Sequence, residues 1–128
     1  MADPLHVELV AADRTVWSGE AAIVITRTAD GDIGVLSGHA PLLSVLVEGT
    51  VEIRTPDGDY VVAAVDGGFL SVANNRISIL AENGELASEI NLAEAKAELE
   101  RVQAGGDDVD EAAVRAAEAR VRAVEKAS

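Results

Sequence analysis

The sequence predicts a two-part fold, an N-terminal β-sandwich or barrel followed by a C-terminal antiparallel pair of helices. Between residues 5 and 82, short apolar runs rich in β-branched residues alternate with turn signals at close spacing, which is typical of all-β domains. After Glu82 the apolar residues instead recur three or four positions apart, the spacing of a helix face. We therefore expect a β domain over residues 2–84 and a helical hairpin over residues 88–126.

The expected strands follow one another closely along the chain. Leu5, Val7 and Leu9 alternate with their neighbours, so they share one face of a strand. Asn74-Asn75 tolerates left-handed backbone geometry and suits a two-residue hairpin. The other segments expected to be extended are Ile23–Thr26, Val51–Arg54, Tyr60–Val65, Phe69–Ala73 and Arg76–Ala81.

Two glycine-containing stretches stand out among these strands. Residues 31–51, GDIGVLSGHAPLLSVLVEGTV, are apolar, contain one proline and are expected to end at a turn at Glu48-Gly49. Residues 64–72, AVDGGFLSV, are expected to form a tight turn at Asp66-Gly67-Gly68 that leads into a strand. These residues indicate constraints of backbone geometry and a docking surface.

The tail predicts two helices joined by a short glycine-containing loop. Ser88 can cap the first helix, or Asn91 can do so with Glu94 three residues later. Gly105-Gly106 ends this helix, and Asp107, Asp108 and Asp110 offer a cap for the next one. The apolar stripes are Leu92, Ala95, Leu99 and Val102 in the first helix, and Val114, Ala117, Val121 and Val124 in the second. Because these stripes consist mostly of Ala and Val, we expect the tail to be held weakly.

Composition excludes several classes of function. The chain has no cysteine, which excludes disulfides and thiolate sites. Its formal net charge of −13 disfavours binding to nucleic acid or directly to anionic lipid. Residues 1–86 carry 13 acidic and 4 basic residues, which gives −9, whereas residues 112–128 carry 2 acidic and 4 basic residues, which gives +2. No apolar run is long enough to span a bilayer and the N-terminal residues do not have the pattern of a secretory signal, so we expect a cytosolic protein unless a partner carries it elsewhere.

No arrangement of residues indicates catalysis. The two histidines, His6 and His39, are far apart in the sequence, and no Gly-Lys-Ser or Gly-Lys-Thr phosphate loop occurs. The acidic residues near Asp108 lack the glycine and the closing glutamate of a calcium loop, so a helix cap is the better interpretation. We expect neither a metal site nor a cofactor.

Together, the two glycine-containing stretches resemble the epsilon subunit of the F-type ATP synthase, and the resemblance covers nearly the whole chain. It implies a flattened β-sandwich of about ten strands and a non-catalytic role in the central stalk, or rotor. There the subunit joins the stalk to the membrane ring and couples proton flow to ATP synthesis. The implied partners are the gamma subunit of the stalk, the c subunits of the ring and the catalytic beta subunit. The implied location is the cytoplasmic face of the cell membrane, where protein contacts hold the subunit peripherally.

The resemblance also implies roles for single residues. Asp32 and His39 match family positions on the rim that faces the ring, although a histidine bonded locally within its loop is an equally good interpretation of His39. Trp17 is a candidate for the stalk interface, and a place at the edge of the core is the slightly better interpretation. Four bases of the second helix are candidates for contacts with the catalytic head that inhibit ATP hydrolysis, or else form a solvated helix face: Arg115, Arg120, Arg122 and Lys126.

One family feature is absent from this sequence. Some bacterial members bind ATP through an aliphatic residue, Asp, two variable positions, Arg and Ala at the start of the first tail helix. In the matching stretch Asn91 replaces the aspartate and Glu94 replaces the arginine, where a carboxylate would repel a triphosphate. We therefore expect no ATP binding by this route.

Two other functions remain as alternatives. A free-standing acidic sandwich that binds a peptide or a small ligand would have a deep pocket or a strand-accepting edge. An enzyme on a cupin-like or jelly-roll frame would bring several histidines and acids to a metal, which two scattered histidines do not support.

Overall fold

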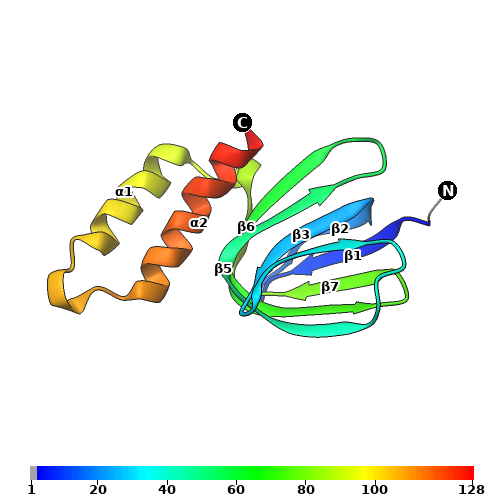
Figure 1. The fold of residues 1–128 in the computed structure, drawn as a ribbon. Helices are drawn as coiled ribbons and strands as arrows, with labels where there is room; N and C mark the ends of the chain where they lie inside the picture. The colour runs from blue at the N-terminus through cyan, green and yellow to red at the C-terminus, as the bar shows by residue number, and fades with distance from the viewer. Residues whose placement is uncertain (1–2) are drawn as a thin grey trace.

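The computed structural model describes residues 3–128 of the chain. In this part of the chain, eight strands precede two α-helices and two short 3-10 helices (Figure 1). The strands are β1 (Leu5–Val10), β2 (Thr15–Ala21), β3 (Ile23–Thr28), β4 (Gly31–Leu36), β5 (Leu42–Arg54), β6 (Tyr60–Ala73), β7 (Arg76–Leu80) and β8 (Gly84–Leu86). The helices are η1 (Ala87–Glu89), α1 (Leu92–Gln103), η2 (Gly106–Asp108) and α2 (Glu111–Ala127).

The strands form one sheet that folds over on itself. Its order is β2-β1-β7-β6-β5-β3-β4, and β8 pairs with β6. The C-terminal half of β6 pairs with β7 and its N-terminal half pairs with β8, while β5 pairs with β6 along both halves. The two halves of the sheet therefore face each other as a flattened sandwich, with the helices packed beside it (Figure 1). This confirms the predicted β-sandwich followed by a two-helix hairpin.

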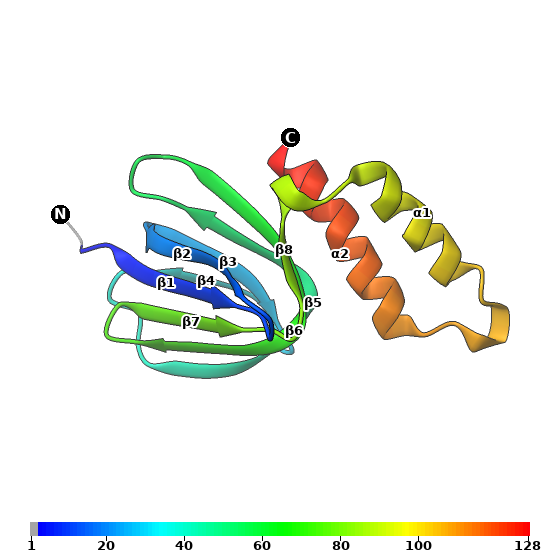
Figure 2. The ribbon, with the colours of Figure 1, turned by 180° about the vertical axis from the view of Figure 1, so that it is seen from behind.

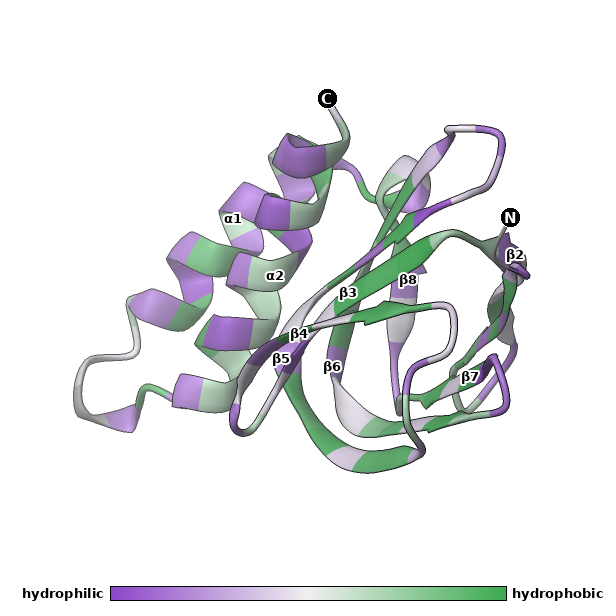
Figure 3. Cartoon of the chain, turned by 45° about the vertical axis from the view of Figure 1, so that its right-hand side comes forward, coloured by the Kyte–Doolittle hydropathy of each residue, from purple (hydrophilic) through white to green (hydrophobic). Residues whose placement is uncertain are grey.

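The core of the sandwich consists almost entirely of aliphatic side chains. Leu5, Val7 and Leu9 are buried and the residues between them are exposed, as the alternation predicts. In Figure 3, β3 is coloured as hydrophobic over most of its visible length, whereas hydrophobic and hydrophilic residues alternate along both helices. The main cluster also includes Val24, Val35, Val51, Ile53, Leu70, Val72, Ile77 and Ile79.

Two expected turns are in fact parts of long strands. Glu48-Gly49 lies within β5, which runs unbroken for 13 residues, and Asp66-Gly67-Gly68 lies within β6, which runs for 14. Gly67 and Gly68 have φ values of +107° and +129°, and a Cβ at Gly68 would overlap the carbonyl oxygen of Leu80. These glycines bend β6 where the sheet folds over and do not reverse the chain. The expectation of about ten strands is also wrong for residues 3–128, because β5 and β6 each pass through both halves of the sandwich as a single strand.

The hairpin between β6 and β7 agrees with the prediction. Asn74 and Asn75 have φ values of 52° and 60°, the left-handed geometry that asparagine tolerates. The Asn75 side chain accepts a hydrogen bond from the Gly38 amide at 2.8 Å and donates one to Ser37 Oγ at 3.2 Å. The β6–β7 turn thereby fixes the loop between β4 and β5.

Both α-helices begin at side-chain caps that the sequence offered. Asn91 Oδ1 accepts a hydrogen bond from the Glu94 amide at 3.0 Å, so Asn91 is the cap of α1, while Ser88 lies in η1. Asp110 caps α2 by accepting from the Ala112 and Ala113 amides at 3.0 and 3.4 Å. The side chain of Asp107, another cap candidate, lies outside the described part of the structure.

The tail packs against the outside of the sandwich (Figure 2). Helix α2 lies between α1 and the sheet, and it contacts β5 and β6. A second apolar cluster forms there, with Ala119 and Ala123 of α2 fully buried against Val62 and Ala64 of β6. Ala95 of α1 joins the same cluster from the other side. The two helices therefore share one small, alanine-rich seam with the sandwich.

An ion pair also joins the sandwich to the start of the tail. Arg14, in the β1–β2 turn, donates hydrogen bonds to both carboxylate oxygens of Glu89, at 3.0 and 2.8 Å. These hydrogen bonds lower the pKa of Glu89 and raise that of Arg14. The chain is therefore anchored at η1, immediately before α1 begins.

No helix in residues 3–128 is long and apolar enough to cross a membrane.

Candidate docking surfaces

Asp32 lies near the start of β4, the edge strand of the sheet. The register places it opposite Arg27 of β3, and Arg27 Nε donates a hydrogen bond to Asp32 Oδ1 at 2.9 Å. This hydrogen bond lowers the pKa of Asp32, which the positive charges of Lys126 and Arg122 on α2 lower further. Asp32 is thus an exposed carboxylate that is already paired and faces the tail helix.

His39 lies beyond the other end of β4, in the loop before β5. Its side chain is half-buried and Nδ1 lies 2.7 Å from the carbonyl oxygen of Ala40. This contact agrees with a histidine bonded within its own loop. The structure does not bring Asp32 and His39 together, because β4 from Asp32 to Leu36 spans about 13 Å and His39 lies farther along the chain. A contact with the membrane ring that used both residues would extend along the whole β4 edge.

Trp17, on β2, has an intermediate position. Its ring is half-buried and packs against the main core cluster. Gly19 makes room for this ring, since a Cβ at that position would lie 2.9 Å from Trp17 Cη2. On its exposed side Trp17 lines an open hollow of about 490 Å³ together with Tyr60 of β6 and Val124 of α2. Trp17 therefore both supports the edge of the core and presents part of its surface to solvent.

The bases of α2 contact the sandwich. Arg120 Nε donates to Glu85 Oε1 at 2.8 Å, and its Nη2 lies 3.4 Å from Oε2 of the same carboxylate. The hydrogen bond to Glu48 raises the pKa of Arg115. The other ion pairs of these bases are Arg115–Glu48 at 3.1 Å, Lys126–Glu52 at 3.3 Å and Arg122–Glu118 at 3.8 Å. Three of the four bases named as contacts for a catalytic head are thus paired with the sandwich in this conformation.

An exposed apolar surface lies on the other half of the sheet. Most of it falls in the two glycine-containing stretches that indicated a docking surface, although the sequence did not identify its residues. The register places Val45 of β5 opposite Phe69 of β6, and Phe69 opposite Leu80 of β7. Leu43 lies two residues before Val45 on the same face, and Leu43 and Phe69 are 75% and 55% exposed. We call Leu43, Val45, Phe69 and Leu80 the apolar row. In the sequence, these strands carry apolar residues on both faces, so the alternation of residues does not indicate which apolar face is exposed.

The described residues offer no site for catalysis by a metal. No group of three or more His, Asp or Glu side chains within residues 3–128 is placed to hold a metal ion. At the start of α1, Asn91 is occupied as a helix cap and Glu94 is exposed.

Comparison with known proteins identifies the family. A family profile described as the beta-sandwich domain of the ATP synthase delta/epsilon chain matches residues 4–87. The chain is 60% identical over 124 residues to a Streptomyces avermitilis protein named ATP synthase epsilon chain, covering 97% of this chain and 98% of that protein. The chain belongs to the family of ATP synthase epsilon chains.

Other relatives agree with this assignment, and a solved structure shares the fold. Proteins of the same name from Rhodococcus opacus and Corynebacterium diphtheriae are 52% and 47% identical to the chain, covering 96% and 98% of it and 98% and 97% of those proteins. A chain in the mitochondrial ATP synthase of Euglena gracilis, in an assembly of OSCP, F1 and the c-ring, has the same fold. The TM-score is 0.75 at 24% identity, and the match covers 97% of this chain and 81% of that one. The resemblance that the two glycine-containing stretches predicted is thus confirmed.

Proposed function

We propose that this chain is a non-catalytic rotor subunit in the central stalk of a proton-translocating F-type ATP synthase. In this role it couples rotation of the membrane ring to ATP synthesis in the catalytic head. The observation that carries the proposal is the match to ATP synthase epsilon chains over nearly the whole length of the chain. The corresponding location is the cytoplasmic face of the cell membrane, where contacts with other subunits hold the chain.

The apolar row is our candidate for docking on the gamma subunit of the stalk. Large exposed apolar side chains that cluster on one face of a soluble protein mark interaction sites, and aromatic residues often dominate the binding energy. Phe69 is the only phenylalanine and lies between Val45 and Leu80 across three strands. Trp17 remains a second candidate for the stalk interface, and it lies on β2, at the edge of the sheet opposite β4.

The β4 edge is our candidate for contact with the c subunits of the ring. Asp32 provides an exposed carboxylate at one end of this edge and His39 provides an imidazole beyond the other end. A surface ion pair contributes only about 0–1 kcal/mol, and Asp32 already pairs with Arg27. Shape and apolar contact, including the exposed side chain of Leu36 between them, would therefore supply most of the docking energy.

We assign a regulatory role to the tail. For α2 to reach the catalytic beta subunit, it must first leave the sandwich and give up the ion pairs of Arg115, Arg120 and Lys126. An acidic segment of the head would then replace the sandwich glutamates as the partner of these bases. The docked conformation is thus the one in which the tail does not inhibit hydrolysis.

Binding to purified partners tests the proposal. The full-length chain is expected to bind the gamma subunit and a gamma–c-ring subcomplex of its own enzyme. Phe69→Asp should weaken binding to gamma at least about tenfold, since it places a charge in the centre of the apolar row. Leu36→Asp is the matched control, because Leu36 is 59% exposed but lies outside the row, and it should change binding to gamma by less than about twofold.

The outcomes separate the function from the surface assignments. If the wild-type chain binds neither gamma nor the subcomplex, the rotor function is wrong and a free-standing binding module becomes the better interpretation. If wild-type and Phe69→Asp chains bind equally well, only the apolar row is wrong as the docking site. For the tail, removal of residues 89–128 from the assembled enzyme should increase ATP hydrolysis and leave coupling largely intact, and unchanged hydrolysis would remove the inhibitory role.

A further inference from the structure

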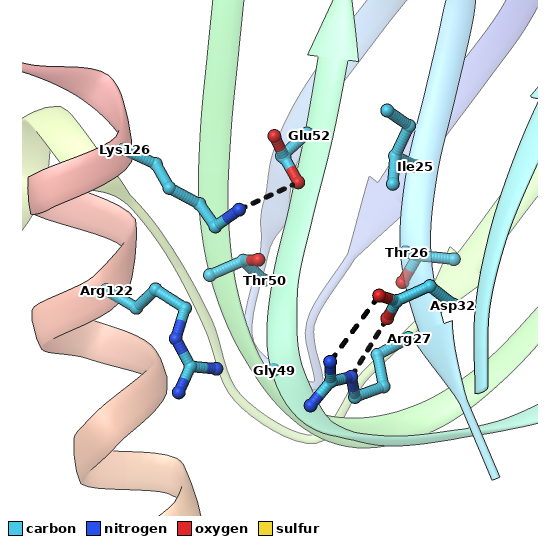
Figure 4. A pocket seen from close by; sticks show the side chains of 9 residues that line it. All are labelled: Ile25, Thr26, Arg27, Asp32, Gly49, Thr50, Glu52, Arg122 and Lys126. Atoms are coloured by element: carbon cyan, nitrogen blue, oxygen red, sulfur yellow. Dashed lines mark hydrogen bonds and ion pairs between the residues drawn. The ribbon is translucent and has the colours of Figure 1, made fainter.

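A small polar hollow lies between α2 and the outer face of the sheet. Its volume is about 170 Å³, and its lining includes side chains of β3, β4, β5 and α2. Figure 4 shows Arg122 and Lys126 extending from α2 toward the sheet, with Arg27 and Asp32 on the opposite wall. At about 30 Å³ for each water molecule, this space holds about six waters. It suits a small ion and is smaller than the pockets that usually hold drug-sized ligands.

The charges that line the hollow are not balanced. Three bases, Arg27, Arg122 and Lys126, face two acids, Asp32 and Glu52, so the lining carries a net charge of +1 in a chain whose net charge is −13. The pKa of Asp32 is lowered by Lys126 and Arg122 as well as by Arg27, so the positive charges of α2 act across the hollow. The lining of the hollow is therefore locally positive on an acidic protein.

Both acids of the lining are already occupied. Asp32 accepts hydrogen bonds from Arg27, and Glu52 accepts from Lys126 Nζ at 3.3 Å and from the hydroxyl of Tyr60. Arg122 differs, since within residues 3–128 its guanidinium donates no side-chain hydrogen bond to the protein. In the part of the chain that the structure describes, its only ion pair is with Glu118 of its own helix, at 3.8 Å, beyond hydrogen-bond distance. The fork of Arg122 is thus the available donor in this hollow.

The floor of the hollow leaves room beside this donor. Gly49 and Thr50 of β5 line it, and Gly49 has no side chain to fill the space. A Cβ at Gly49 would lie 3.5 Å from Cβ of Arg27, so a larger residue there would narrow the hollow from the sheet side. The Thr50 hydroxyl is a further donor on the same wall.

We propose that this hollow is a binding site for a phosphate-type oxyanion, with the guanidinium of Arg122 as the main ligand and Lys126, Arg27 and Thr50 around it. An arginine fork matches two oxygens of a tetrahedral oxyanion, which is why arginine is common at phosphate sites. The bound anion would bridge α2 to β3 and β5 and so hold the tail in its docked position. This inference goes beyond the proposed function and does not depend on it, because it concerns the isolated chain.

A titration of the full-length chain followed by NMR tests the site. Inorganic phosphate is added at constant ionic strength, with chloride as the compensating ion. Saturable shifts are expected at the Gly49 and Thr50 amides and at the side-chain Nε–H of Arg122. Arg122→Gln should raise the half-saturating phosphate concentration at least tenfold. Arg101→Gln is the matched control, since Arg101 is an exposed tail base on α1 outside the hollow, and it should change this concentration by less than twofold.

Additional arms identify the source of the phosphate group and the effect on the tail. ATP that saturates the same amides at lower concentration than inorganic phosphate would assign the site to the terminal phosphate of a nucleotide, whereas the reverse order would assign it to free phosphate. Either result supports the site, provided that adenosine gives no shift at these amides. Slower hydrogen exchange of the α2 amides with phosphate than with chloride is expected in the wild-type chain and not in Arg122→Gln.

Three results would overturn the proposal. The first is a response of Gly49 and Thr50 that increases linearly with phosphate and is equally large with chloride. The second is a half-saturating concentration that is the same for wild-type and Arg122→Gln chains whose spectra show the same fold. The third is saturable binding that leaves α2 exchange unchanged, which would refute the bridge between the tail and the sheet.

Discussion

The ion pair between Arg120 and Glu85 offers the sharpest test of how the tail is held. It connects α2 to β8, its side chains are 29% and 39% exposed, and both guanidinium contacts reach the same carboxylate. The perturbation is a double-mutant cycle of Arg120→Gln, Glu85→Gln and both together. Glutamine keeps most of the side-chain volume, so the cycle measures the interaction between the two charges.

The expected coupling follows from the exposure of the pair. Exposed ion pairs contribute about 0–1 kcal/mol, and this pair should lie in the upper half of that range because it is bidentate and partly shielded from water. A coupling of about 0.5–1 kcal/mol changes the equilibrium for opening of α2 by a factor of about two to five. The coupling should decrease at about 1 M salt, where the screening length falls to about 3 Å.

Hydrogen exchange of the α2 amides in the full-length chain provides the assay. Each single substitution should accelerate exchange, and the double substitution should accelerate it by less than the product of the two single effects. Glu100→Gln is the control, since Glu100 is an exposed acid on α1. If the two single effects multiply within error, or if Glu100→Gln accelerates α2 exchange as much as Glu85→Gln, the sandwich does not hold the tail through this pair.

Three further predictions concern the sandwich. Gly68→Ala should lower the free energy of unfolding in urea by at least about 2 kcal/mol, because its Cβ would overlap the Leu80 carbonyl at a positive φ. Gly58→Ala is the control, since open space surrounds Gly58, and it should lower the free energy of unfolding by about 1 kcal/mol. Equal losses in the two variants would contradict this account. Burial and the Glu52 carboxylate raise the pKa of Tyr60, the only tyrosine, to about 12. The neutral phenol therefore stabilises the fold below pH about 10, and this contribution is lost as the pH rises toward 12. A phenolate absorbance titration of the folded chain with a midpoint near 10 would refute this prediction. Asn75→Gly keeps the left-handed geometry but removes the side-chain hydrogen bonds to Ser37 and Gly38. The NMR amide signals around His39 should therefore broaden or shift, with little change in the free energy of unfolding. Unchanged signals would show that these hydrogen bonds do not order the loop.

The strands and caps could be predicted because each has a local cause. Alternation at Leu5, Val7 and Leu9 has one structural outcome when one face is buried, and Asn91 and Asp110 can satisfy the free amides of a helix start. The left-handed pair Asn74-Asn75 belongs to the same group. In each case a few neighbouring residues determine the geometry, so no knowledge of distant contacts is needed.

The bends of the long strands could not be predicted because glycine occurs both in turns and at positions within strands where another backbone comes close. At Gly68 the glycine is required by the close approach of the Leu80 carbonyl, which lies on another strand. At Gly49 a Cβ would make only ordinary contact with Arg27 of β3, at 3.5 Å, and the backbone of β5 continues through it. Both positions have the sequence appearance of a turn, and at Gly68 the cause is a neighbour 12 residues away. Local sequence therefore indicated the right positions and the wrong geometry.

The buried surface of α2 is wider than the predicted stripe. Of that stripe, Ala117 is buried and Val121 and Val124 pack partly buried against the second apolar cluster, but Ala119 and Ala123 are buried as well. In an alanine-rich helix several faces have nearly equal hydrophobicity, so periodicity predicts the helix and leaves the width of its buried face undetermined. The residues of the apolar row could not be singled out within the predicted docking stretches, because an exposed hydrophobic residue in a strand looks the same in sequence as a buried one.

The way in which the tail is held explains why the tail, and not the sandwich, suits a regulatory role. The buried centre of the seam of α2 with the sheet includes Ala119, Ala123, Val62 and Ala64, while Tyr60, Val121 and Val124 beside them are only partly buried. Each methylene that a larger side chain would add contributes about 0.8 kcal/mol of burial that this seam lacks. The remaining contacts are surface ion pairs, whose net contribution is small because both partners are well hydrated when apart. Glutamates on another surface could therefore replace those of the sandwich at little cost in free energy. By contrast, the sandwich core contains at least eight large aliphatic side chains with no solvent exposure or almost none, so leaving its fold would be far more costly than undocking α2.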